Sequence, residues 1–216
     1  MNACFITATG TDIGKTYVTT MLCRELRGIG LKVRALKPVL SGYTPKEVST
    51  SDSGLILDAL GETATEAGVV EITPWRFAAP LSPDMAAERE GRTIDFEALV
   101  RFCQPSKEDF LLVEGVGGAM VPLTQSETVL DWVVALGYPA LVVAGSYLGT
   151  ISHTLTTVNA IRQRGAEVCG VVVSESESSP VPVSETVETI GRFLAGIPVV
   201  GLPRTGAVEL APLLGL

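Results

Sequence analysis

The sequence is poor in the residues that build metal and nucleophile sites. It contains a single histidine and four cysteines, and no two cysteines stand at CxxC spacing. There is accordingly no Ser-His-Asp or Cys-His order and no zinc-type cluster. Each cysteine (Cys4, Cys23, Cys103 and Cys169) lies in an apolar stretch, so we expect buried free thiols, as in proteins of a reducing compartment. The histidine, His153, falls in the first turns of an expected helix, where a structural and a catalytic role both stay open.

Positive charge and long apolar runs are also scarce. The 16 Lys and Arg residues stand against 24 Asp and Glu, a net charge of -8, which argues against a nucleic-acid-binding surface. Any anionic ligand must therefore be bound by a local site. The longest apolar run, residues 132–145, is broken by Gly137 and Pro139 and is shorter than the about 20 residues of a membrane-spanning helix. The N-terminus lacks the basic region of a signal peptide, so we expect a cytoplasmic protein that binds neither nucleic acid nor membrane.

Hydrophobic residues make up 46% of the 216 residues, enough for a sizeable core. Short β-branched runs alternate with longer segments of helical period, which predicts an α/β fold: a single-domain parallel β-sheet, residues 1–216, flanked by helices. The expected strands span residues 3–7, 32–39, 109–113, 140–144, 168–174 and 198–200, and the expected helices residues 15–27, 51–60, 150–164 and 183–194. Ligands of such sheets gather beyond the carboxyl ends of the strands, so the residues after each strand are the candidates for a site.

Residues 8–16 join the first expected strand to the first expected helix and read as a phosphate-binding loop. Gly14 lets the backbone approach a phosphate, Lys15 reaches the β- and γ-phosphates, and the Thr16 hydroxyl binds magnesium. The strict pattern requires a glycine five residues before Gly14, where this sequence has Thr9. The strand–loop–helix context supports a P-loop NTPase-like domain all the same, and the alternative is an ordinary turn in which Gly-Lys-Thr is accidental.

Charged residues follow other expected strands. Lys37 stands just before Pro38, from where its ammonium would reach the phosphate loop; the alternative is a lysine with a buried stem and a solvated head. Glu114 precedes a glycine-rich turn, a place that suits a magnesium ligand beside a phosphate, and the alternative is a solvated glutamate in a tight turn. Asp52 is either a second such carboxylate or, with Ser51, a helix cap.

In their joint order and spacing, these stretches resemble the dethiobiotin synthetase family over essentially the whole chain. The resembling stretches are residues 7–16, 37–42, 51–52, 79–83, 114–118, 131–132 and 148–153. The family's phosphate loop is one residue longer than the standard pattern, which accounts for the displaced glycine. The resemblance implies that 7,8-diaminononanoate, carbon dioxide and ATP give dethiobiotin, ADP and phosphate.

The resemblance also implies a mechanism and its residues. An amine takes up carbon dioxide as a carbamate, the carbamate accepts the γ-phosphoryl group to give a mixed anhydride, and the second amine expels phosphate and closes the ureido ring. The catalytic residues would be Lys15, Lys37 and Thr11. Mg²⁺ would be bound by Thr16, Asp52 and Glu114.

Further contacts follow from the same resemblance. The nucleotide would lie against Asp12, Ile13, Gly14, Lys15, Thr16, Tyr17, Asp52, Glu114, Gly115, Val116, Gly117, Ser174, Glu175, Pro203, Arg204 and Thr205. The substrate would contact Thr11, Lys37, Ser41, Pro80 and Gly118. The family works as a homodimer, with the substrate site at the interface, where the neighbouring subunit would offer Leu148, Gly149, Thr150 and Ile151 to the substrate carboxylate.

Three residues depart from the family pattern. Ala8 replaces a Gly, and Ser152 replaces an Asn beside the histidine. Ser174 replaces an Asn that reads the adenine edge, and because a hydroxyl cannot make that paired contact, the preferred base of the nucleoside triphosphate stays open.

Other functions fit parts of the sequence. A partitioning or cell-division ATPase, which works as a switch, carries a second lysine where this chain has Gly10, and no amphipathic C-terminal membrane helix is evident here. A corrinoid-amidating synthetase needs an attached glutaminase, for which the chain has no room. A non-catalytic nucleotide-binding module would differ only in turnover.

Overall fold

The structure, a computed structural model, describes residues 2–107, 109–206 and 208–216. At the centre of the described residues is a six-stranded sheet in the order β2-β5-β1-β6-β7-β8, in which paired strands run parallel. A second, two-stranded parallel sheet is formed by β3 and β4. The strands are β1 (Ala3–Ala8), β2 (Val33–Leu36), β3 (Val39–Ser41), β4 (Trp75–Phe77), β5 (Phe110–Glu114), β6 (Ala140–Gly145), β7 (Val168–Ser174) and β8 (Val199–Leu202).

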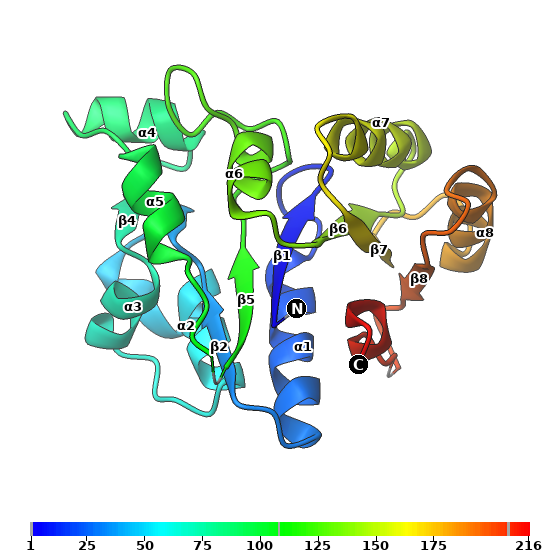
Figure 1. Cartoon of the computed structure of the whole chain (residues 1–216), viewed down its shortest axis with the longest axis horizontal. Helices are drawn as coiled ribbons and strands as arrows, with labels where there is room; N and C mark the ends of the chain where they lie inside the picture. Colours follow the sequence, from blue (N-terminus) through cyan, green and yellow to red (C-terminus); the bar gives the residue numbers. More distant parts are fainter. Residues whose placement is uncertain (1, 108, 207) are drawn as a thin grey trace.

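Helices cover the sheet and extend beyond both of its edges (Figure 1). The helices are α1 (Lys15–Gly28), α2 (Asp52–Ala59), α3 (Glu66–Ile72), α4 (Pro83–Arg89), α5 (Phe96–Phe102), α6 (Val129–Leu136), α7 (Thr150–Gln163) and α8 (Val183–Phe193), with short 3-10 helices η1 (Pro45–Thr50) and η2 (Ala211–Leu214). In Figure 1, α3, α4 and α5 gather with β4 at the β2 edge, α7 lies beside β6 and β7, and α8 lies at the β8 edge. The helix α1 packs on β1, β2 and β5, next to α2.

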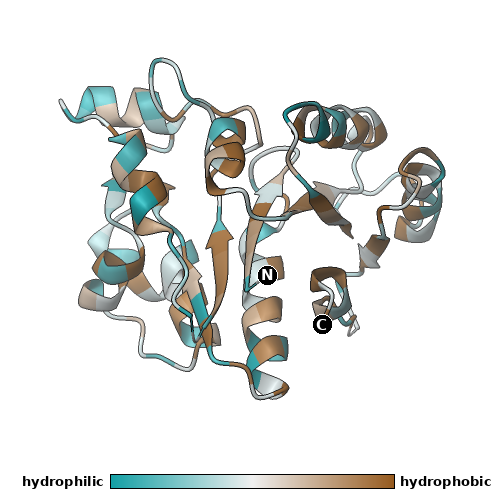
Figure 2. Cartoon of the chain, viewed as in Figure 1, coloured by the Kyte–Doolittle hydropathy of each residue, from teal (hydrophilic) through white to brown (hydrophobic). Residues whose placement is uncertain are grey.

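The core is built on the two central strands. Both β1 and β6 are buried along their whole length, as expected for parallel strands covered on both faces. On β1, the Phe5 ring meets Trp132 of α6 edge-on, with ring centroids 4.9 Å apart. Figure 2 shows the same pattern, with apolar strands inside and hydrophilic residues on the helices. Burying one side chain the size of Phe contributes about 1.5–3 kcal/mol to the free energy of folding. Packing of this kind along β1 and β6 holds in place the strand ends from which the loops emerge.

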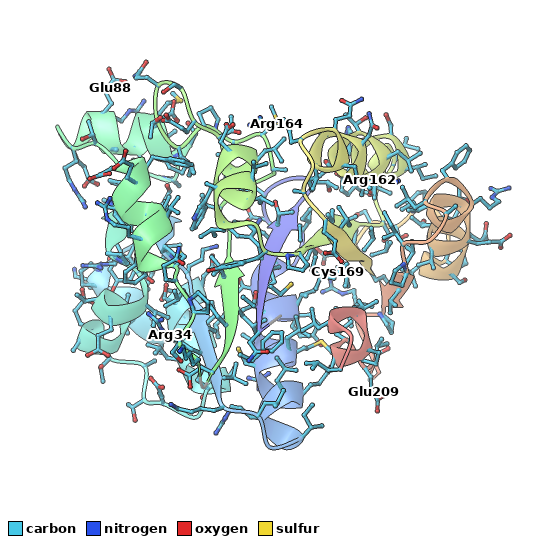
Figure 3. The ribbon with its side chains drawn as sticks, in the orientation of Figure 1. Arg34, Glu88, Arg162, Arg164, Cys169 and Glu209 are labelled. Atoms are coloured by element: carbon cyan, nitrogen blue, oxygen red, sulfur yellow. The ribbon has the colours of Figure 1, made fainter. Side chains whose placement is uncertain are left out.

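Two polar contacts tie distant elements together. Glu25 of α1 accepts hydrogen bonds through Oε2 from the backbone N–H groups of Leu210 and Ala211, each at 2.8 Å, which fastens the C-terminal segment to α1. Arg164, which lies just after α7 and is labelled in Figure 3, pairs with Asp131 of α6 at 2.8 Å.

The predicted strand over residues 32–39 is wrong in one respect, because the chain forms two strands there. β2 ends at Leu36, and Pro38, which has no N–H, cannot continue a ladder. The N–H of Lys37 instead donates to the carbonyl of Ile72 at 3.2 Å, and the chain continues as β3 beside β4. The other predicted strands and helices are confirmed to within two residues at each end. That residues 1–216 form a single domain stays a prediction.

The cysteines are free thiols. Cys4, Cys23 and Cys103 are buried as predicted, and burial raises the pKa of Cys23 and of Cys103 to about 12. Cys169 on β7 (Figure 3) is only partly buried, which corrects the expectation for it, because it lines a pocket beside η2. None of the described helices is long and apolar enough to cross a bilayer.

Candidate active site

The loop between β1 and α1 lies at the carboxyl ends of the central strands. Gly14 precedes α1 with a φ of 103°, which glycine adopts without the strain of a side chain. A Cβ added there would lie 2.9 Å from Ser174 Oγ, so this loop approaches the end of β7 closely. No side chain of the described residues caps the first turn of α1, which leaves its backbone N–H groups available to an anion. The loop geometry therefore suits a phosphate.

The ammonium group of Lys15 places a positive charge at this loop. Its side chain is buried, and Nζ donates to the carbonyl of Gly10 at 3.1 Å. Burial, and then the positive charge of Lys37, lower the pKa of Lys15 to about 8. Among the described residues no carboxylate is in ion-pair contact with Lys15. An anion bound here would offset both unfavourable effects.

The ammonium group of Lys37 is a second positive charge at the site, and it makes three contacts. Its Nζ lies 2.6 Å from Glu114 Oε1, 2.9 Å from the carbonyl of Gly115 and 3.2 Å from Asp52 Oδ2. Burial alone would lower the pKa of Lys37, but the two carboxylates outweigh it and raise the pKa. With only 2% of its surface exposed, Lys37 does not have the solvated head of the alternative interpretation, which is therefore wrong.

Glu114 is the buried partner of this cluster. It is 0% exposed, so the alternative of a solvated turn residue is wrong. Its Oε1 accepts from the Thr16 hydroxyl at 2.8 Å as well as from Lys37. Its Oε2 is buried and has no hydrogen-bond partner among the described residues. An unpartnered buried carboxylate oxygen is costly unless a cation or donor occupies it.

Asp52 completes the cluster, and Ser51 is the helix cap. The Ser51 hydroxyl accepts from the N–H of Gly54 at 3.1 Å, which leaves the Asp52 carboxylate free to pair with Lys37. Burial by itself would raise the pKa of Asp52. The charge of Lys37 and the hydrogen bond from Thr16 lower the pKa by more than burial raises it, so the net shift is downward. The carboxylates of Asp52 and Glu114 and the Thr16 hydroxyl thus lie together, linked by hydrogen bonds and ion pairs. These oxygens fit Mg²⁺, which takes few protein ligands and completes its coordination shell with phosphate and water.

Two pockets open on the phosphate loop and share Asp12, Ile13 and Gly14. The larger pocket, of about 600 Å³, contains both ammonium groups and extends to Ser41 and Pro80. The buried Ser41 hydroxyl has no hydrogen-bond partner among the described residues. The smaller pocket, of about 460 Å³, runs along the end of β7 and the segment after β8. A long anion lying on the loop would thus reach into both pockets.

Known proteins are similar to this chain over nearly its whole length. A family model described as an AAA domain matches residues 2–214. The ATP-dependent dethiobiotin synthetase of Acidiphilium cryptum is 50% identical over 202 residues, covering 92% of this chain and 91% of its own length. That of Methylobacterium nodulans is 45% identical over 214 residues, 95% of each chain. The chain belongs to the dethiobiotin synthetase family.

The fold also has a solved neighbour outside the dethiobiotin synthetase family. A ParA family ATPase from Chlorobium tepidum superimposes with a TM-score of 0.52 over 94% of this chain and 84% of that one, at 13% identity. At that identity the likeness shows a shared P-loop fold alone.

Most of the residues that the resemblance to dethiobiotin synthetases assigns to the site lie at the two pockets. The larger pocket is lined by Thr11, Asp12, Ile13, Gly14, Lys15, Thr16, Lys37, Ser41, Asp52, Pro80, Val116 and Gly117. The smaller pocket is lined by Tyr17, Ser174, Glu175, Pro203 and Arg204. The Glu114 carboxylate and the carbonyl of Gly115 accept hydrogen bonds from the Lys37 ammonium group. Gly118 packs on the phosphate loop, since a Cβ there would lie 3.2 Å from the Gly10 nitrogen.

Other predicted residues lie away from these pockets. Thr205 is exposed one residue past the smaller pocket and does not line it, and its assignment to the nucleotide stays a prediction. Residues 148–151 line neither pocket; their role was predicted for a neighbouring subunit and stays a prediction. His153 also lines neither, and its Nδ1 lies 2.9 Å from the Tyr147 hydroxyl.

The sequence interpretation missed some pocket residues. Ser176, Glu177 and Leu202 line the smaller pocket, and Val121 lines the larger. Ser176 and Glu177 stand two and three residues after Ser174, just past the end of the predicted strand 168–174, so their place in the chain was a usable signal. Val121 stands three residues after the glycine-rich stretch 114–118, but an apolar side chain in an irregular segment gives no chemical sign of a binding role.

Proposed function

We propose that the chain is an ATP- and Mg²⁺-dependent dethiobiotin synthetase, a ligase that forms the ureido ring of dethiobiotin from 7,8-diaminononanoate and carbon dioxide. The names of its relatives support the ATP-dependent reaction. The observation that carries the proposal is the presence of two buried ammonium groups, Lys15 and Lys37, in one pocket that extends to Ser41. Such a pair suits phosphoryl transfer from one anion to another, where charge neutralisation and positioning matter most.

The reaction has three steps. One amine attacks carbon dioxide, forming a C–N bond and losing a proton, which gives a carbamate. A carbamate oxygen attacks the γ-phosphorus of ATP, the bond from that phosphorus to the bridging oxygen breaks, and ADP leaves. The second amine then attacks the carbamoyl carbon, the C–O bond to the phosphoryl group breaks, and phosphate and a proton leave as the ring closes.

The residues of the larger pocket would share this work. Lys15 and the uncapped N–H groups of α1 neutralise the β- and γ-phosphates. Lys37, oriented by Glu114, neutralises the negative charge on the carbamate oxygen and on the phosphoryl group during its transfer. The Thr11 and Ser41 hydroxyls contact the diamine or its carbamate, and the unpartnered state of the Ser41 hydroxyl supports a role in binding.

Mg²⁺ would be held by Thr16, Asp52 and Glu114. The unpartnered Oε2 of Glu114 supports this assignment, as does the hydrogen bond from Thr16 to the same carboxylate. When bound, the ion neutralises phosphate oxygens and orients the triphosphate.

The base of the nucleotide would occupy the smaller pocket. Ser174 offers a single hydroxyl there, in contrast to the paired donor and acceptor of an amide, so we propose weak discrimination between bases.

The proposed enzyme is a homodimer. Leu148, which is 87% exposed just before α7, would lie at the interface between the two subunits. Residues 148–151 of one subunit would then receive the carboxylate of the substrate bound in the other, at a helix start that favours an anion.

The test is turnover with labelled bicarbonate, Mg²⁺ and the diamine, with ATP, GTP and CTP in separate reactions. We expect one phosphate released per ureido product, detected by mass, and no phosphate release when the diamine is omitted. Triphosphate hydrolysis that is independent of the diamine, with no labelled ring product, would contradict the proposal and favour a switch ATPase.

A further inference from the structure

Residues 174–177 form the inner wall of the smaller pocket. Two sets of contacts, at Ser174 and at Glu175, hold this wall in place. At its start, Ser174 lies against Gly14 of the phosphate loop. Next, the N–H of Glu175 donates to the carbonyl of Leu202, and Glu175 Oε2 accepts from the N–H of Arg204, both at 2.9 Å. These contacts fix the wall to the phosphate loop and to β8, but they leave its far end to a third attachment.

The third attachment is a pair of reciprocal hydrogen bonds between Ser146 and Ser176, here called the serine clasp. The N–H of Ser146 donates to Ser176 Oγ at 2.9 Å, and the N–H of Ser176 donates to Ser146 Oγ at 2.8 Å. Ser146 is buried, and its carbonyl accepts from the Ser179 hydroxyl at 3.2 Å. Each hydroxyl thus satisfies the backbone donor of the other loop, so losing either hydroxyl leaves an amide unpaired.

The clasp joins the wall to a rigid anchor. Ser146 directly follows β6, and the Thr150 hydroxyl of α7 donates to the carbonyl of Gly145 at 2.6 Å. Gly145 is needed for the close approach, since a Cβ there would lie 2.8 Å from Ser176 Oγ. The loop after β7 is therefore fixed against the end of a fully buried strand.

We propose that Ser146 is a positioning residue for the nucleotide base, acting through Ser176. Ser146 lines neither pocket, whereas Ser176 lines the smaller one. The clasp holds the wall in its binding conformation before the nucleotide arrives, which lowers the ordering cost of binding. The inference rests on the proposed function, because it takes the smaller pocket as the base site.

The experiment compares Ser146→Ala, Ser176→Ala and the double variant with a control, Ser178→Ala. Ser178 is exposed on the same loop, outside the clasp. Binding is measured by calorimetry without the diamine, for the Mg²⁺ complex of ATP and, separately, of inorganic tripolyphosphate. We expect both clasp variants to raise the Kd for ATP roughly three- to tenfold, as a partly populated wall conformation requires. The double variant should match the single ones, because either change opens the clasp.

Tripolyphosphate separates the possible outcomes, since it lacks a base and binds the phosphate loop alone. We expect its Kd to be the same in all variants. An unchanged Kd for ATP in Ser146→Ala overturns the inference, and so does an equal loss of affinity for tripolyphosphate, which would indicate damage to the phosphate loop. Hydrogen exchange of the wild-type wall gives a second measurement, in which ATP but not tripolyphosphate should increase protection of residues 174–177. A wild-type protein that binds neither compound would instead contradict the proposed function.

Discussion

Lys37 and Glu114 form a buried ion pair that joins the ends of two neighbouring strands, with 2.6 Å between Nζ and Oε1. The pair brings together a proposed catalytic cation and a proposed magnesium ligand, so neither can move without the other. Removing one member of a buried pair leaves a charge without compensation, at a cost of about 3–5 kcal/mol. Substitutions here must therefore be judged by activity and by stability together.

Lys37→Gln tests the catalytic cation. The Gln amide can still donate to Glu114, but it carries no charge, so we expect kcat to fall by roughly 10²–10³-fold. Thermal unfolding is measured in parallel to check that the variant is folded. Lys46→Gln, at an exposed position, is the control and should keep wild-type activity. A Lys37→Gln enzyme with near-normal kcat/KM would remove Lys37 from the mechanism.

Asp52→Asn tests the metal assignment. The amide loses the charge that would bind Mg²⁺, so we expect the half-saturating Mg²⁺ concentration for turnover to rise by roughly tenfold or more. Asp58→Asn is a matched control on the same helix, where Asp58 pairs with Arg24 at the surface. Identical Mg²⁺ titrations for Asp52→Asn and the wild type would exclude Asp52 from the metal site.

Lys15→Met tests the cost of the buried ammonium in the absence of ligand. The pKa of Lys15 in the folded protein, about 8, lies below the ordinary lysine pKa of 10.5, so the unfolded chain binds more protons between pH 8 and pH 10.5. Stability therefore rises with pH across this window, and the full cost is present below pH 8. We expect Lys15→Met to raise the free energy of unfolding at pH 7 by up to about 3 kcal/mol, with a difference that shrinks towards pH 10.

Denaturant unfolding at several pH values measures this difference. The variant should also lose affinity for tripolyphosphate, since the cation is gone. If Lys15→Met is less stable than the wild type at pH 7, the burial cost is smaller than the value that its lowered pKa implies.

Gly14→Ala tests the close approach of the phosphate loop to β7. A Cβ at Gly14 meets Ser174 Oγ at 2.9 Å and strains a φ of 103°. Gly137→Ala is the control, because Gly137 has a φ of 65° but its added Cβ meets nothing within 4 Å. We expect both variants to lose about 1–2 kcal/mol of stability from backbone strain. Only Gly14→Ala should weaken ATP binding, by calorimetry, and equal ATP affinities in the two variants would contradict a role for the contact.

The sequence predicted the central sheet well because its strands are short, apolar and followed by clear helical patterns. Val168–Ser174, for instance, has the continuous apolar run of a strand buried on both faces. The phosphate loop was predictable for a related reason, since its glycine, lysine and threonine have fixed places relative to a strand and a helix. The split between β2 and β3 was missed because a transfer of the chain to a second sheet at Pro38 leaves no pattern in the local sequence.

The rest depended on contacts that no local pattern encodes. The short helices α3 to α6 are an exception, since Thr65, Asp95 and the Thr128–Asp131 capping box start α3, α5 and α6, signals that the sequence interpretation did not use. The Ser146–Ser176 clasp joins residues that neither belong to a motif nor lie near each other in sequence. The charge state of Lys15 likewise follows from burial and from Lys37, which only the folded arrangement brings together.

The strand order has a consequence for biosynthesis. The strand β1, which leads into the phosphate loop, is flanked in the sheet by β5 and β6, so its partners are residues 110–114 and 140–145. A nascent chain that ends before residue 110 leaves both edges of β1 unpaired, and one that ends before residue 140 still leaves one edge unpaired. An unpaired apolar strand of this kind is a segment that chaperones bind and that aggregates. Translation must therefore pass residue 145 before the phosphate loop has both of its neighbouring strands, however early in the message the loop is encoded, and residue 204 before the smaller pocket is complete.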